Sequence, residues 1–170
     1  MRIGYGFDSH EFRAGIPLKI GGVALVHDKG LGGHSDGDVL LHAITDALLG
    51  AIAAPDIGAL FPPSDPKWKN ADSMVFVEAA LKRVKKAGYR VGNVDASLIL
   101  AAPKIGPHAS AIRARVAKVL GIPEDCVGLK AKTPEGLNLD NTAVAHVVVL
   151  LEKHTDTAAT PKLVSQKKRR

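Results

Sequence analysis

The first ten residues constrain the fold most strongly, because they alternate between two kinds of side chain. Successive side chains of a β-strand point to opposite faces of a sheet. A strand from Arg2 to His10 would therefore group the large apolar residues on one face: Ile3, Tyr5 and Phe7. Its other face would carry two glycines followed by Asp8 and His10. We expect a two-faced strand, with a carboxylate and an imidazole side by side on the face that lacks bulk.

Segments with strand and helix periodicity alternate along the rest of the chain, without the glycine-rich turn of a dinucleotide-binding fold. Further strands are expected over residues 18–20, 23–26, 89–102, 127–133 and 143–152, with Gly21-Gly22 joining the first two. Helices are expected over residues 38–53, 72–87 and 108–120, the first capped by Ser35 or Asp36. Segments 28–37 and 55–70, rich in glycine and proline respectively, are expected to be loops. A chain of 170 residues suits one domain, so we expect a single α+β domain with a mixed β-sheet and helices packed on one face.

The apolar and cysteine content argues against membrane and secreted proteins. No apolar run approaches the roughly 18 residues that a membrane-spanning helix needs, and the longest, Ala143 to Leu151, is interrupted by His146. The single cysteine, Cys126, excludes an internal disulfide and a multi-cysteine zinc site, and it suits a reducing cytoplasm. Because the first strand begins at Arg2, we expect no signal peptide, no membrane partner and a cytoplasmic location.

The formal net charge of +6 is concentrated at the C-terminus. Removing the four basic residues at 167–170 leaves +2. A basic tail can contact nucleic acid or an anionic surface, but a solvated, disordered terminus is the commoner case. No other basic cluster is interleaved with the aromatic residues that a nucleic-acid platform needs. We therefore expect a folded domain at 1–153, a disordered basic tail at 154–170 and no nucleic-acid partner.

Asp8 and His10 leave the same face of the expected strand, and His42 lies on the expected helix. Asp38 and Asp46 stand four residues before and after His42, so all three share one face of that helix. If this face meets the strand, one carboxylate and two imidazoles converge, which suits zinc with one open position. The spacing alone leaves ordinary structural pairing equally open. Asp46 has a further alternative, because it could orient the His42 ring without touching a metal.

Two further segments carry groups that suit phosphate and nucleotide. In the run Lys130 to Glu135, a lysine, a hydroxyl and a carboxylate could serve a phosphate together with magnesium, which prefers oxygen ligands. In the run Ala101 to Pro107, exposed backbone groups could read a base edge while Lys104 meets phosphate. Taken singly, each segment is more commonly an ordinary charged strand end or a plain turn.

The motifs follow one another in an order that is more specific than any one of them. The first set comprises Arg2-Ile3-Gly4, Gly6-Phe7-Asp8-Ser9-His10 and His34-Ser35-Asp36-Gly37-Asp38, with His42 and Asp46. The second set comprises Asp56-Ile57-Gly58, Phe61-Pro62, Asp72-Ser73, Gly92-Asn93-Val94-Asp95, Ala102-Pro103-Lys104 and Lys130-Ala131. Over about residues 1–152, this order closely resembles the 2-C-methyl-D-erythritol 2,4-cyclodiphosphate synthase family of the non-mevalonate isoprenoid pathway. The resemblance implies a homotrimer with active sites between subunits.

The resemblance also implies a reaction and its residues. The substrate would be 4-diphosphocytidyl-2-C-methyl-D-erythritol 2-phosphate, which is cyclised by a phosphorus–oxygen lyase with release of CMP. Zinc would be held by Asp8, His10 and His42, supported by Asp46, while Glu135 would bind Mg²⁺ or Mn²⁺ on the substrate diphosphate. His34 and Thr133 would stabilise the transition state. The implied substrate-binding residues are Asp8, Ser9, His10, His34, Ser35, Asp56, Ile57, Gly58, Phe61, Pro62, Pro63, Ser64, Asp65, Ala101, Ala102, Pro103, Lys104, Ile105, Gly106, Lys132, Thr133, Pro134 and Glu135.

Two departures and two rival functions accompany this resemblance. Tyr5 stands where members often have His, and residues 136–142 are short and contain no arginine, so we assign no arginine contact to phosphate. A zinc-dependent phosphoester hydrolase is the alternative enzyme, since an open metal position can activate water. A metal-stabilised binding module, tethered through its basic tail, is the non-enzymatic alternative.

Overall fold

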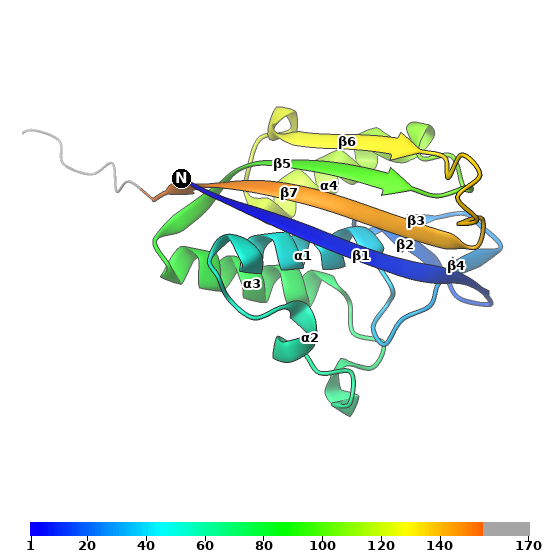
Figure 1. Cartoon of the computed structure of the whole chain (residues 1–170), viewed down its shortest axis with the longest axis horizontal. Helices are drawn as coiled ribbons and strands as arrows, with labels where there is room; N and C mark the ends of the chain where they lie inside the picture. The colour runs from blue at the N-terminus through cyan, green and yellow to red at the C-terminus, as the bar shows by residue number, and fades with distance from the viewer. Residues whose placement is uncertain (155–170) are drawn as a thin grey trace, which may run out of the picture.

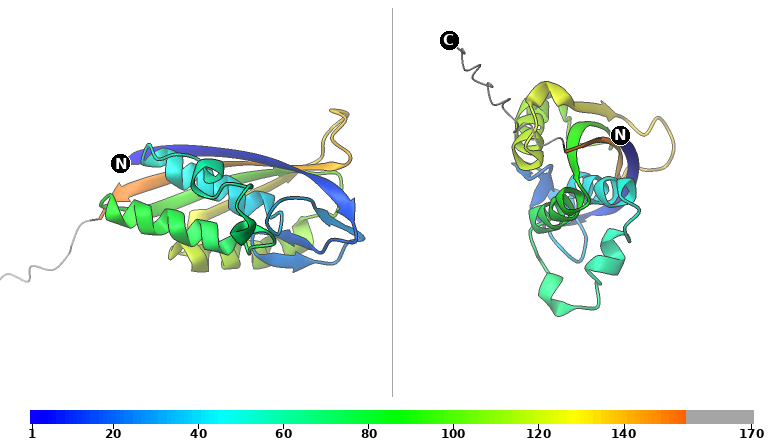
Figure 2. Two further views of the ribbon diagram at one scale, coloured as in Figure 1. Left: turned by 90° about the horizontal axis from the view of Figure 1, so that it is seen from below. Right: turned by 90° about the vertical axis from the view of Figure 1, so that its left-hand side faces the viewer.

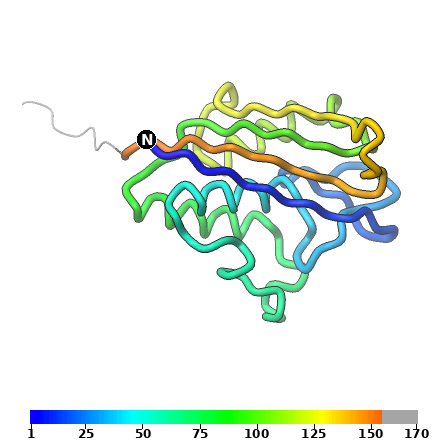
Figure 3. The backbone as a smooth tube through the Cα atoms, viewed as in Figure 1, coloured from blue at the N-terminus to red at the C-terminus, as the bar shows by residue number. Residues whose placement is uncertain are grey.

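Two long antiparallel strands form the centre of the computed structural model, which describes residues 1–154 (Figure 1). Strand β1 (Arg2–Ala14) pairs with β7 (Thr142–Lys153), in a register that runs from Arg2 opposite Leu151 to Glu11 opposite Thr142. Because the two strands run in opposite directions, the beginning and the end of the described chain lie at the same end of the sheet (Figure 3).

Three more strands complete a sheet with the order β4-β1-β7-β5-β6 in this part of the chain. Strand β5 (Tyr89–Ile99) is antiparallel to β7, whereas β6 (Val127–Lys132) is parallel to β5. At the opposite edge, β4 (Lys29–Leu31) pairs antiparallel with β1. The mixed sheet is therefore confirmed. The prediction of a plain loop over residues 28–37 is wrong, because three residues around a glycine carry too weak a pattern for β4 to be recognised.

The predicted hairpin is present as β2 (Leu18–Ile20) and β3 (Val23–Leu25). Its turn consists of Gly21 and Gly22 with φ of +63° and +73°, a region that glycine adopts at little cost. Both backbone N–H groups of the turn donate to the Asp38 carboxylate, at 2.9 and 2.7 Å. The hairpin is thereby tied to the start of helix α1 (Val39–Ala51).

Asp38 is also the cap of α1, since its carboxylate accepts the backbone N–H of Leu41 at 3.1 Å. The prediction that Ser35 or Asp36 caps this helix is wrong. The Asp36 carboxylate is occupied by Lys19 and Ser73, and the Ser35 hydroxyl faces His42. Complete burial raises the pKa of Asp38, although the three backbone N–H groups that it accepts oppose this shift.

Three helices cover one face of the sheet: α1, α3 (Met74–Lys86) and α4 (Ala109–Leu120) (Figures 1 and 2). They confirm the three predicted helices, and α4 ends at Gly121 with φ of +67°. The predicted loop 55–70 contains the short helix α2 (Ile57–Leu60) and the 3₁₀ turn η1 (Pro66–Trp68). The remaining 3₁₀ turns of the described chain are η2 (Gly106–His108) and η3 (Glu124–Cys126). The hydrophobic core lies between this helical layer and the sheet.

Helix α1 packs directly on the backbone of β1 at Gly4 and Gly6. A Cβ atom added to Gly4 would lie 1.9 Å from the carbonyl oxygen of Ala47, and one added to Gly6 would lie 1.9 Å from that of Ala43. Only glycine, which lacks a Cβ atom, fits at these two positions, because a non-bonded carbon atom cannot approach an oxygen atom this closely. The glycines of the alternating N-terminal pattern therefore set the short distance between β1 and α1.

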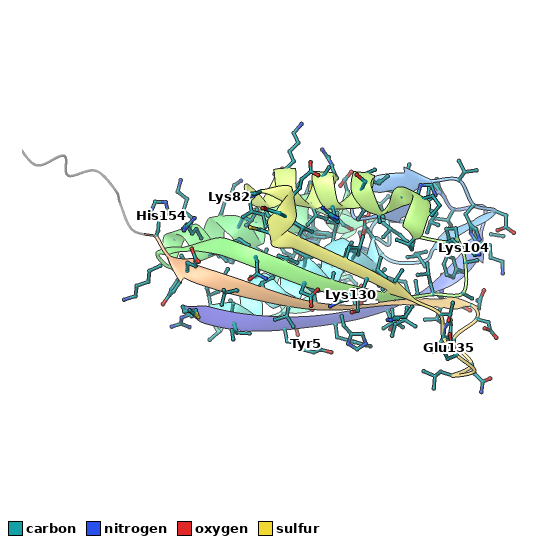
Figure 4. All side chains as sticks on the ribbon, turned by 90° about the horizontal axis from the view of Figure 1, so that it is seen from above. Tyr5, Lys82, Lys104, Lys130, Glu135 and His154 are labelled. Atoms are coloured by element: carbon teal, nitrogen blue, oxygen red, sulfur yellow. The ribbon has the colours of Figure 1, made fainter. Side chains whose placement is uncertain are left out.

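The other face of the sheet is uncovered by the described residues, and it carries the apolar half of the β1 pattern. Ile3, Tyr5 and Phe7 are 68%, 58% and 49% exposed. On the adjacent β7, Val148 lies opposite Tyr5 and is also exposed. Figure 4 shows Tyr5 pointing away from the helices. The predicted two-faced strand is confirmed, and its apolar face forms a stripe in contact with solvent.

No helix within residues 1–154 is both long and apolar enough to cross a bilayer. The predicted disordered tail falls on residues 155–170, outside the described residues, except for its first member. That residue, His154, is tied to the domain because its backbone N–H donates to the Gly88 carbonyl at 2.8 Å.

Candidate functional site

The three predicted metal ligands converge where α1 meets β1. The Asp8 Oδ2 atom lies 2.9 Å from His10 Nε2 and 3.0 Å from His42 Nδ1, and the two ring nitrogens are 3.0 Å apart. Among residues 1–154, these side chains form the one cluster of three or more potential ligands. The strand alternation supplies Asp8 and His10, and the glycine contact between β1 and α1 brings His42 to them.

A divalent metal ion fits these donor atoms. Zinc bound tetrahedrally at roughly 2.0–2.1 Å holds neighbouring ligand atoms about 3.3 Å apart. The triangle of donor atoms, with sides of 2.9, 3.0 and 3.0 Å, is only slightly smaller. One carboxylate oxygen with two imidazole nitrogens is typical of zinc sites that keep a fourth position open. The residues present can therefore hold such an ion.

Charge within the triad favours a cation. Burial alone raises the pKa of Asp8, but hydrogen bonds with His10 and His42 outweigh it and lower the pKa to about 2. Burial alone lowers the pKa of His10, but the hydrogen bond and the charge of Asp8 raise it above its ordinary value. Asp8 is therefore an anion at neutral pH, held in a site that attracts positive charge.

The second ring nitrogen of His42 faces two hydroxyl groups. His42 Nε2 lies 2.9 Å from Ser35 Oγ and 2.8 Å from Ser73 Oγ. Asp46, predicted as the partner of this ring, accepts the backbone N–H of Ile57 at 2.8 Å instead. Its carboxylate thus joins α1 to α2, and the hydrogen-bond partners of His42 Nε2 are the two serine hydroxyls. Sequence reasoning missed Ser73 in this role, although the residue stands in a recognised motif.

A cavity of about 190 Å³ opens beside the triad; we call it the metal cavity. Its lining residues are His10, His34, Ser35, His42, Ile57, Gly58, Phe61, Pro63, Trp68 and Phe76. The ring of Phe61 packs against Trp68 and Phe76, with centroid separations of 5.0 and 4.7 Å. Trp68 and Phe76 were not among the predicted site residues. The sequence signal that could have indicated them is the scarcity of these aromatic residues. The chain has one Trp and four Phe, and three of these five pack together here.

A larger cavity of about 480 Å³ lies at the ends of β5 and β6; we call it the lysine cavity. Its lining residues are Leu100, Ala101, Pro103, Lys104, Ile105, Gly106, Pro107, Ala109, Leu129, Ala131, Lys132 and Thr133. The Ala102–Pro103 peptide bond in its wall is cis. Lys104 and Lys132 are the two cationic side chains of this lining, which otherwise consists mainly of backbone and small apolar groups.

The two cavities lie apart in one chain and share no lining residue. Strand β1 carries Asp8, strand β6 leads to Thr133, and β7 and β5 separate them. Neighbouring strands are about 4.8 Å apart, so β1 and β6 lie about 14 Å from each other across the sheet. Each chain therefore presents two separate cavities.

Comparison with known proteins settles the family. The YgbB family model matches residues 1–152. The chain belongs to the YgbB family. Over 153 residues it is 72% identical to the 2-C-methyl-D-erythritol 2,4-cyclodiphosphate synthase of Koribacter versatilis (strain Ellin345), covering 90% of this chain and 99% of that protein. It is also 52% identical over 155 residues to the chloroplastic synthase of Arabidopsis thaliana, covering 89% of this chain and 67% of that protein.

Solved structures of this family agree with the fold. A 2C-methyl-D-erythritol-2,4-cyclodiphosphate synthase in a form bound to CDP matches with a TM-score of 0.84 at 42% identity, covering 89% of this chain and 100% of that chain. The resemblance drawn from the ordered motifs is therefore confirmed, as is the single α+β domain.

Most predicted substrate-binding residues line one of the two cavities. The exceptions, which lie outside both linings, are Asp8, Ser9, Asp56, Pro62, Ser64, Asp65, Ala102, Pro134 and Glu135. Ser9 is exposed, and strand alternation sends its side chain to the opposite face from Asp8 and His10. Asp56 and Asp65 instead cap α2 and η1 by accepting the backbone N–H groups of Ala59 and Lys67.

Glu135 lies in the loop after β6, beside the lysine cavity. The Thr133 hydroxyl donates to its carboxylate. The backbone of Glu135 has φ of +46°, which is uncommon for a residue with a side chain, and Gly136 follows with φ of +80°. Figure 4 shows this loop projecting past the end of the sheet on its uncovered side. The side chains of Thr133 and Glu135 are therefore in contact beside the lysine cavity.

Proposed function

We propose that the chain converts 4-diphosphocytidyl-2-C-methyl-D-erythritol 2-phosphate into 2-C-methyl-D-erythritol 2,4-cyclodiphosphate and CMP, within the non-mevalonate isoprenoid pathway. The supporting observation is the Asp8–His10–His42 triad beside an open cavity, in a chain whose relatives are synthases of this cyclic product. An oxygen of the 2-phosphate attacks the β-phosphorus, and the bond from that phosphorus to CMP breaks. The protein must therefore bring two anionic phosphates together rather than supply a nucleophile.

Zinc is the metal that we assign to the triad, because one carboxylate and two imidazoles match its preferred donors. When bound, the ion neutralises phosphate charge and fixes the position of phosphate oxygens. His34 lines the same cavity, where its ring Nε2 lies 3.3 Å from the Asp65 carbonyl oxygen. We assign His34 to stabilise the charge that develops on the transferred phosphoryl group. The Phe61, Trp68 and Phe76 rings keep water away from this end of the substrate.

The lysine cavity receives the cytidine diphosphate in this proposal. The turn of residues 101–106 supplies backbone groups to the base, while Lys104 and Lys132 supply positive charge to the phosphates. Thr133 stabilises the transition state through its hydroxyl, and Glu135 holds Mg²⁺ or Mn²⁺ on the diphosphate. A CDP-bound structure of a relative supports a nucleotide ligand for this family.

A homotrimer with active sites between subunits accounts for the separation of the two cavities. The metal cavity of one subunit and the lysine cavity of its neighbour would together bind one substrate. The exposed stripe of Ile3, Tyr5 and Phe7 supports this assembly, because the uncovered face of the sheet is an apolar surface that a second copy can bury. The free cysteine, Cys126, favours a cytoplasmic location.

Product analysis tests the proposed function against its rivals. The purified chain with zinc and magnesium is incubated with the cytidine substrate, and the phosphorus-containing products are followed by ³¹P NMR. Formation of the cyclic diphosphate with an equal amount of CMP is the expected result. A linear phosphate product would instead support the phosphoester hydrolase, and unchanged substrate with tight binding would support a binding module.

A further inference from the structure

A chain of hydrogen bonds runs from the surface to the back of the metal triad. Lys19 Nζ lies 3.1 Å from Asp36 Oδ2, and Asp36 Oδ1 accepts the hydroxyl of Ser73. Ser73 Oγ in turn lies 2.8 Å from His42 Nε2, on the side of the ring opposite Asp8. This series of hydrogen bonds links Lys19, Asp36, Ser73 and His42. Of these four residues, only His42 is assigned above to the metal, and none is assigned to the substrate.

The direction of each hydrogen bond in this chain is determined by the groups present. An ionised carboxylate can only accept, so the single hydroxyl hydrogen of Ser73 is donated to Asp36. Ser73 Oγ can then only accept from His42, which places a hydrogen on Nε2. A neutral imidazole with hydrogen on Nε2 presents the lone pair of Nδ1, the atom that faces Asp8 Oδ2 at 3.0 Å. That lone pair is the one that a metal ion held beside Asp8 and His10 would take.

Asp36 is held in place strongly enough to impose this direction. Its carboxylate is largely buried, and it also accepts the backbone N–H groups of Ser73 and Asp38, at 3.3 and 3.4 Å. The hydrogen bond from Lys19 supplies a compensating positive charge, and it raises the pKa of Lys19. The Asp36 carboxylate is therefore held in one orientation and is not free to turn away.

Ser73 itself is completely buried, and its hydroxyl does not cap the helix that it precedes. It is the first residue before α3, where a serine side chain normally accepts a backbone N–H of the helix. Its side chain makes no such capping bond, and Asp72 accepts the backbone N–H of Met74 instead. The Ser73 hydroxyl instead contacts Asp36 and His42, while Ser35 Oγ lies farther away at 3.4 Å.

We infer that Ser73, held by Asp36, is a positioning residue that keeps Nδ1 of His42 directed at the metal and thereby sets metal affinity. The inference deepens the proposed function, because it rests on the triad binding a metal ion. Ser35 Oγ also lies 2.9 Å from Nε2, but its hydrogen is not committed to a carboxylate in the described contacts. Ser35 therefore cannot impose the direction that Ser73 imposes.

The test measures zinc binding without substrate, by competition with a chelating dye on protein that has been stripped of metal. Ser73→Ala should weaken zinc binding by about ten- to a hundredfold, which is the usual effect of removing a partner that orients a metal-binding histidine. Asp36→Asn, which keeps the size of the side chain, should weaken it in the same direction. Ser35→Ala should have a smaller effect than Ser73→Ala.

Thr45→Val is the matched control. Thr45 is completely buried one turn along α1 from His42, and its hydroxyl donates to the Leu41 carbonyl rather than to the ring. The inference predicts that this variant keeps the zinc affinity of the parent even if its unfolding free energy falls. Equal zinc loss in Thr45→Val and Ser73→Ala, or unchanged affinity in both Ser73→Ala and Asp36→Asn, would overturn it.

The readout separates this inference from the proposed function. A protein that binds zinc in a Ser73-dependent manner but forms no cyclic product would support the inference and contradict the proposed reaction. If the parent protein forms the cyclic product while Ser73→Ala and Asp36→Asn bind zinc as tightly as the parent, the proposed reaction is supported and the inference is contradicted. If Ser73→Ala does not fold, Asp36→Asn with the same titration decides the matter.

Discussion

Gly6 of β1 lies directly against Ala43 of α1, so closely that a Cβ atom at residue 6 would be 1.9 Å from the Ala43 carbonyl oxygen. Ala43 is the residue after His42, and Gly6 stands two residues before Asp8. The contact that packs the helix on the strand is therefore also the contact that assembles the metal triad.

Gly6→Ala should separate α1 from β1 and pull His42 away from Asp8. We expect a loss of unfolding free energy of about 1–3 kcal/mol or more, as for other overpacked cores. We expect zinc binding to weaken at least tenfold, because the ligand atoms no longer meet. Chemical denaturation and a zinc titration measure the two effects.

Gly50→Ala is the matched control for this substitution. Gly50 lies on the same helix, but a Cβ there would meet only the Tyr5 carbonyl oxygen at an ordinary 3.7 Å. Alanine favours a helix over glycine, so stability should rise by up to about 1 kcal/mol with zinc affinity unchanged. Normal zinc binding by Gly6→Ala would show that the close contact does not assemble the site.

Zinc binding should weaken as pH falls, and the decline should begin at a higher pH than the ordinary pKa of histidine would give. A metal ion can bind His10 only after its proton has left, and Asp8 raises the pKa of His10 above 6.5. Affinity should thus be level above the folded pKa and fall about tenfold per pH unit below it. Asp8, with a pKa of about 2, contributes no change near neutrality.

Zinc titrations between about pH 5.5 and 8.5 measure this profile. His27→Gln provides a control, since His27 bonds to the Lys29 carbonyl outside the triad and should leave the midpoint unchanged. An affinity that stays constant down to pH 6 would contradict the predicted competition by protons.

Lys104 should contribute to nucleotide binding by its charge. Lys104→Gln should weaken CDP binding by about tenfold or more, because a hydrogen bond to a charged group contributes about 1.5–3 kcal/mol. Lys82→Gln removes a lysine of α3, which Figure 4 shows far from Lys104, and should leave CDP affinity unchanged. Isothermal titration with CDP compares the two. Equal affinities for both variants would remove Lys104 from the proposed nucleotide site.

The metal triad was predictable because local patterns encode most of it. Alternation in β1 puts Asp8 and His10 on one face, and the same alternation requires the glycines on which α1 packs. The helical period places His42 on the buried side of α1. The family resemblance then supplied the reason for bringing these two elements together, which no local pattern contains.

The surroundings of the triad were less predictable, because they depend on distant partners. Ser73 reaches His42 from the start of α3, 31 residues along the chain, and nothing in local spacing connects the two. Asp46 has ideal helical spacing to His42, yet the backbone N–H of Ile57 engages its carboxylate. Asp38 likewise became the cap of α1 because the glycine turn between β2 and β3 holds it there.

Because the two cavities are separate, mixing subunits can test whether ring closure takes place between two subunits. One variant, His42→Ala, lacks a triad ligand, and the double variant Lys104→Ala with Lys132→Ala lacks the charge of the lysine cavity. Each alone should form almost no cyclic product. In the proposed trimer, an intact site would combine the triad of the lysine double variant with the lysine cavity of a neighbouring His42→Ala subunit.

The most direct measurement is cyclic product formation, followed by ³¹P NMR, after equal amounts of the two inactive variants are unfolded and refolded together. If each site combines half-sites from neighbouring subunits, about a quarter of the sites in a random mixture are intact, so about a quarter of the parent activity should return. No recovered cyclic product in a mixture that forms mixed trimers would contradict ring closure between two subunits.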